Sequence, residues 1–111
     1  MEELTKPQKK KVRELIDRAL EREFKEFLLS VRGLVADVET TNSLSDMYSK
    51  LYDSFKAFDK RLSMRYGDIR GSQYFNIILW LFIEKKLTLE DISEFDDEMR
   101  DGIVEKAKMW E

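Results

Sequence analysis

Apolar residues recur at steps of three and four along the first third of the chain, from Val12 to Val38. An α-helix repeats every ~3.6 residues, so this spacing places them on one face of a helix. The 111 residues include a single proline, Pro7, and four glycines, so few positions would interrupt helices. The pattern predicts an all-α fold: a small bundle of four to five helices in a single domain over residues 1–111.

The first long helix is expected to begin just after Thr5. Thr5 and Gln8 have the spacing of a capping box, and Pro7 suits the first turn, where its missing N–H costs nothing. The apolar phase continues through Gly33 without a shift. The helix could run to Glu39, or stop at Gly33 and restart, and we favour a continuous but weakened helix.

A second long helix, antiparallel to the first, is expected between an N-cap at Ser43 or Ser45 and a C-cap at Gly67. Its apolar residues have heptad spacing: Leu44, Tyr48, Leu51, Phe55, Phe58 and Leu62. Alternating intervals of four and three produce one continuous seam along a helix. This seam should pack in the core, with Phe55 at its centre.

The last third of the chain predicts a buried third helix and one or two short C-terminal helices. Residues 74–83 are apolar on nearly every side, as in a helix covered by several neighbours, and Ser72 is a suitable N-cap. Thr88 and Asp91 have capping spacing for a short helix, and Asp96 should cap the last one.

The chain contains no cysteine and no histidine. It therefore lacks thiolate ligands, disulfides, the commonest general base and the commonest transition-metal ligand. Zinc sites and Ser-His-Asp or Cys-His arrangements are excluded, and we expect a non-enzymatic protein with no metal or cofactor. The longest apolar run, residues 77–83, is far shorter than the ~20 residues that span a membrane. With no signal-peptide pattern, we expect a cytoplasmic protein without a membrane partner.

A basic cluster near the N-terminus suggests phosphate contacts, and it consists of Lys6, Lys9, Lys10, Lys11 and Arg13. Acidic residues surround it, and the whole chain carries a net charge of −3, which is unlike a nucleic-acid-binding protein. A nucleic-acid-associated accessory protein is therefore the first alternative function. Nucleic acid is not the expected partner.

Pairs of carboxylates on the first helix suggest a second alternative, a Mg²⁺-using hydrolase. The pairs are Glu14/Asp17, Glu23/Glu26 and Asp37/Glu39. Such an enzyme needs several carboxylates that converge inside a bundle, whereas these alternate with Lys and Arg. A solvated helix surface with ion pairs at i,i+4 spacing is the better explanation.

The favoured function is a protein-interaction or regulatory module that forms a homodimer or binds another protein. The long first helix and the third helix offer more apolar surface than two short C-terminal helices could cover. The expected interaction surface comprises Leu15, Ile16, Phe24, Arg65, Tyr66 and Arg70. Arg65 and Tyr66 precede the loop Gly67–Ser72, and Arg70 lies within it. The backbone N–H groups of this loop could also receive an anion.

Overall fold

A computed structural model of the chain describes residues 4–67 and 73–110. Within these ranges the ordered elements are five α-helices and no strands, which confirms the all-α prediction. The residues form two compact units. We call residues 1–22 with 69–111 the core unit and residues 23–68 the hairpin unit, and we describe each by itself.

Helix α1 (Lys6–Leu34) supplies residues to both units. It begins with the predicted capping box: the Thr5 N–H donates to Gln8 Oε1 at 2.8 Å, and the Gln8 N–H donates to Thr5 Oγ1 at 3.2 Å. These bonds satisfy two amides that the first turn would otherwise leave without an acceptor. The sequence therefore located this end correctly.

The other end of α1 differs from the prediction. The helix passes through Gly33 as expected, but it ends at Leu34 rather than at Glu39, and residues 35–40 form turns. In these turns the Ala36 N–H bonds to the Gly33 carbonyl, three residues back, at 3.4 Å. Glycine favours a helix less than other residues, which suits an end next to Gly33. Turns with hydrogen bonds three residues apart can continue apolar spacings of three and four over a short stretch. The apolar spacing therefore did not reveal that the α-helix ends at Leu34.

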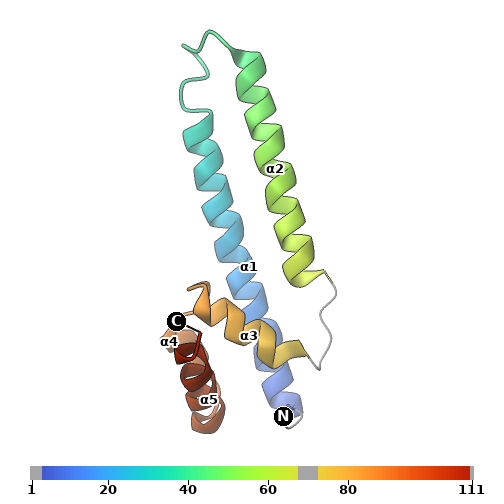
Figure 1. Cartoon of the computed structure of the whole chain (residues 1–111), viewed down its shortest axis with the longest axis vertical. Coiled ribbons are helices and arrows are strands. Elements are labelled where there is room, and N and C mark those ends of the chain that lie inside the picture. Colours follow the sequence, from blue (N-terminus) through green and yellow to red (C-terminus); the bar gives the residue numbers. More distant parts are fainter. Residues whose placement is uncertain (1–3, 68–72, 111) are drawn as a thin grey trace. The chain divides into compact units, whose positions relative to one another are not determined.

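In the core unit, α3 (Tyr74–Ile83), α4 (Leu89–Ile92) and α5 (Asp97–Lys108) bury apolar side chains together with the first part of α1 (Figure 1). The α1 side chains in this core are Val12, Leu15, Ile16 and Ala19. The predicted caps of the short helices are present: Thr88 and Asp91 form a reciprocal capping box, and Asp96 accepts from the Met99 N–H at 2.9 Å.

Helix α3 is the predicted apolar helix, and it buries Phe75, Ile78, Leu79 and Leu81. Trp80 stays 46% exposed and lies 5.6 Å, centroid to centroid, from the ring of Trp110. One side of α3 therefore remains at the surface of the core unit. The predicted Ser72 cap lies outside the described residues.

The chain leaves α3 through Lys85, whose φ of 64° is left-handed. This conformation allows the Lys86 N–H to reach back to the Leu81 carbonyl at 2.8 Å and so to close the helix end. A residue with a Cβ is strained there, whereas glycine is not. Lys85 therefore occupies a backbone conformation that is unfavourable for a residue with a Cβ.

We predict that Lys85→Gly raises the free energy of unfolding of the core unit by roughly 1 kcal/mol, because glycine adopts a left-handed φ without steric cost. Urea titration followed by tryptophan fluorescence measures this change. Lys85→Ala is the matched control, since it removes the same charge and keeps the Cβ. Equal effects of the two substitutions would show that strain at Lys85 is not the cause.

In the hairpin unit, α2 (Leu44–Tyr66) runs antiparallel to residues 23–34 of α1 (Figure 1). Phe24 lies against Phe58, with ring centroids 6.0 Å apart. Helix α2 starts at the predicted cap, where Ser43 Oγ accepts from the Asp46 N–H at 3.3 Å. It ends at Gly67, where a Cβ would collide with the Ser63 carbonyl oxygen.

Only part of the heptad seam predicted for the core is covered in α2. Phe58 is 6% exposed, whereas Phe55, the expected centre of the core, is 55% exposed. Leu44 and Tyr48 are exposed as well. A single neighbouring helix covers only a narrow strip of α2, and that strip centres on Phe58. The rest of the heptad seam lies beside the strip, at the surface.

Candidate functional site

The hairpin unit has almost no core of its own. Phe58 is the only buried residue among residues 23–67, and every other buried hydrophobic side chain of the described chain belongs to the core unit. Two-helix units of this size rarely bury enough apolar surface to offset the entropy of ordering the chain. The hairpin unit therefore exposes apolar side chains that would normally be covered.

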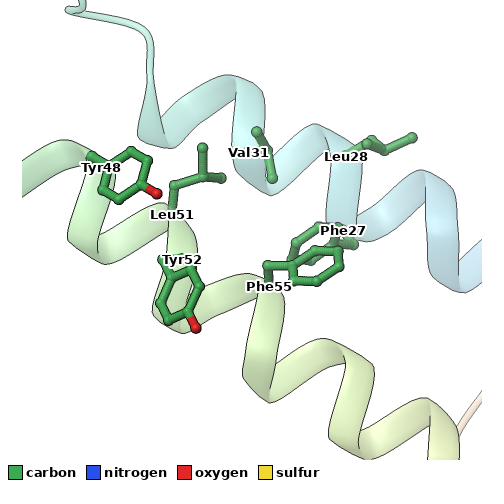
Figure 2. A pocket seen from close by; sticks show the side chains of 7 residues that line it. All are labelled: Phe27, Leu28, Val31, Tyr48, Leu51, Tyr52 and Phe55. Carbon is green, nitrogen blue, oxygen red and sulfur yellow. The ribbon is translucent and has the colours of Figure 1, made fainter.

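These side chains line a groove between the two helices of the hairpin (Figure 2). The groove has a volume of about 450 Å³ and is lined by Phe27, Leu28, Val31, Tyr48, Leu51, Tyr52 and Phe55. Leu28 on α1 and Tyr48 and Tyr52 on α2 are more than half exposed. Apolar patches of this kind commonly mark interaction sites.

The floor of the groove is held by aromatic packing. The ring of Phe27 stacks on that of Phe58, with centroids 4.3 Å apart and planes 8° from parallel. Phe27 also meets Phe55 edge to face at 6.5 Å. Each aromatic pair contributes about 0.5–1.5 kcal/mol beyond its buried area. Phe27 is thus fixed, while Phe55 extends from this cluster toward solvent.

A polar cluster at the end of α2 sets the register of the hairpin. The Glu23 carboxylate accepts hydrogen bonds from Arg65 Nη1 at 3.2 Å and from the Tyr66 hydroxyl. Burial raises the pKa of the Tyr66 phenol above its usual range, and the bond to Glu23 adds to this rise. Tyr66 therefore remains a hydrogen-bond donor at neutral pH.

The structure places the residues of the expected interaction surface in different environments. Leu15 and Ile16 lie in the core of the core unit, because α3–α5 supply the apolar cover that the sequence suggested was missing. Arg65 and Tyr66 are engaged with Glu23, and Arg70 lies outside the described residues. Phe24, 38% exposed, is the one member that belongs to the apolar surface of the hairpin.

The α2 residues of the groove, Tyr48, Tyr52 and Phe55, were missed as a surface because the heptad pattern assigned this side of α2 to the core. One signal could have revealed them. Tyr52 lies next to the seam and widens it beyond the strip that a single partner helix covers. A seam this wide indicates that α2 requires a second apolar neighbour.

The basic cluster is partly neutralised within the core unit. Lys11 Nζ lies 2.9 Å from Glu14 Oε2 and 3.0 Å from Glu94 Oε1. Hydrogen bonds to these two carboxylates raise the pKa of Lys11. Lys6, Lys10 and Arg13 are exposed and Lys9 is half-buried.

The carboxylates of the hydrolase alternative show no convergence in the structure. Glu14 pairs with Lys11, and Glu23 pairs with Arg65. Within residues 4–67 and 73–110, no three acidic side chains gather as a metal site would require. No helix in the same ranges is long and apolar enough to cross a membrane.

Asp91 is the one buried charged residue of the described chain, and two arginines of α1 neutralise it. Arg18 Nη1 donates to Asp91 Oδ1 at 3.0 Å, and Arg22 Nη1 donates to Oδ2 at 2.5 Å. Burial alone would raise the pKa of Asp91. Hydrogen bonds from Arg22, from the Thr88 N–H and from Arg18 outweigh burial and hold this pKa well below its usual range.

A carboxylate with a lowered pKa stabilises the fold above its unfolded-state pKa and loses that contribution as pH falls toward the folded-state value. We predict that Asp91→Asn lowers the free energy of unfolding of the core unit by roughly 2 kcal/mol at pH 7, as is typical for hydrogen bonds to charged groups. The difference from wild type should shrink as pH falls below ~4.

Denaturant titrations between pH 2 and pH 7 measure this difference. Asp101→Asn, which alters an exposed ion pair with Arg100, is the control and should change stability by less than ~0.5 kcal/mol. A difference between Asp91→Asn and wild type that stays constant with pH would contradict the assignment.

Comparisons with protein-family models, with curated proteins and with solved structures found no match to this chain. Function is therefore inferred from the geometry of the two units.

Proposed function

We propose that this chain is a non-enzymatic protein-interaction module of a regulatory kind, and that the groove of the hairpin unit is its binding surface. One observation carries the proposal. The hairpin exposes a groove lined by aromatic and aliphatic side chains while burying only Phe58. Burying exposed apolar area against a partner is favourable by ~25 cal/mol per Å², so this groove can contribute free energy to binding.

The residue types of the groove suit a protein partner. Tyrosine and phenylalanine are enriched at protein interfaces, where a rigid ring buries a large area at a small entropic cost. Tyr48 and Tyr52 both contribute aromatic rings to the lining of the groove (Figure 2). The lining repeats at helical spacing on both helices, which is the pattern that accepts the apolar face of another helix.

Site-specific photocrosslinking in the native cell tests the proposal. A benzophenone amino acid at position 52 replaces an aromatic ring that lines the groove with another aromatic side chain. We expect crosslinked products from this position, since a bound partner must lie within reach of the ring. The same amino acid at Met64, an exposed α2 residue that does not line the groove, is the control. No product from position 52, or equal products from both positions, would refute the proposal.

A further inference from the structure

We infer that the groove of the hairpin unit binds the same groove of a second copy of this chain, so that two hairpins form a four-helix bundle. This inference rests on the proposed function and names its partner. It replaces the dimer contact expected at Leu15 and Ile16, whose side chains are buried within their own unit.

The two-ridged form of the groove supports a second copy. Both antiparallel helices line it, with three residues of α1 between positions 27 and 31 and four residues of α2 between positions 48 and 55. Each hairpin thus offers two neighbouring apolar ridges rather than one. A single partner helix would cover the space between the ridges, whereas a second hairpin covers both. Two-fold packing of one face on itself is the commonest arrangement in soluble homo-oligomers, and four-helix bundles are built from such hairpins.

The exposed apolar area of the hairpin unit makes up a substantial part of what a dimer interface needs. Four aromatic side chains on this face, Phe24, Tyr48, Tyr52 and Phe55, are on average about half exposed. An aromatic side chain can bury about 150–250 Å², so these four supply on the order of 400 Å². A standard interface takes about 800 Å² from each partner. The exposed Leu28, Leu44 and Val38 of the same unit add apolar area toward that figure.

The charges beside the groove are also suited to a copy of the same surface. Lys25 and Arg32 lie three and four residues from Leu28 on α1, and both are exposed. On α2, Asp59 lies one turn beyond Phe55, and Lys56 Nζ sits 5.3 Å above the Tyr52 ring. A site for a strongly acidic or basic peptide would have a rim of one sign. A rim with both signs of charge can face a copy of itself without a row of like charges opposing each other.

Light scattering coupled to size exclusion tests the inference with the 111-residue chain. We expect wild type at micromolar concentration to have twice the 13.3 kDa chain mass. Tyr48→Lys and Leu28→Lys place a charge in the groove at side chains that are 71% and 63% exposed, so each should yield monomers. Lysine is a good helix former and should leave the helices intact.

Met64→Lys is the matched control, because Met64 is 79% exposed on α2 and does not line the groove. This variant should remain dimeric. Both tryptophans, Trp80 and Trp110, belong to the core unit. Their fluorescence reports whether that unit is folded in each variant, and circular dichroism reports whether the hairpin keeps its helices.

A folded wild-type chain that remains monomeric up to several hundred micromolar would overturn the inference. So would a dimer that survives both groove substitutions, because its interface would lie elsewhere. These failures differ from failure of the proposed function. If wild type is monomeric but position 52 still crosslinks to a different protein, the groove is an interaction site whose partner is not a second copy.

Discussion

The hairpin unit depends on one constraint: two helices that pack only on each other can bury one narrow strip of side chains each. In this unit the strip centres on Phe58 and on the stack between Phe58 and Phe27. The sequence nevertheless supplies apolar residues well beyond the strip, at Leu28, Tyr48, Tyr52 and Phe55. An antiparallel pair with this much exposed apolar surface has the form of one half of a four-helix bundle, which is why we propose that the chain acts through this surface.

In the core unit, the apolar side chains of α1 are covered by helices of the same chain. Helices α3–α5 cover the apolar face of α1, and Asp91 joins that face to the C-terminal helices through Arg18 and Arg22. The carboxylate also accepts from the Thr88 N–H in the capping box. A single buried charge thereby fixes the start of α4 and its contact with α1. The two units differ in burial: among the described residues, the core unit buries most of the apolar side chains that α1 contributes to it, whereas the hairpin unit leaves most of its own exposed or half-buried.

The accuracy of the sequence predictions followed the range of the interactions involved. The caps at Thr5, Thr88 and Asp96 were predictable because each joins a side chain to a backbone N–H three residues away. The Asp91 pairs with Arg18 and Arg22 have no such signal, since the partners are far apart in the chain. Heptad spacing identified α2 as a helix, but it could not distinguish the strip that faces α1 from the strip beside it. Because α2 has one neighbouring helix in the hairpin unit, only the strip that faces α1 is covered, and this strip includes Phe58 but not Phe55.

Amide hydrogen exchange measured across a range of protein concentrations tests most directly whether the hairpin is completed by a second copy. Binding stabilises the elements that it covers, and the stabilisation grows with the logarithm of partner concentration once that concentration exceeds Kd. We predict that exchange in α2 slows as the concentration rises through the dimerisation range, while exchange in α5, the internal reference in the core unit, stays the same. Exchange in α2 that is independent of concentration from nanomolar to several hundred micromolar would contradict the account.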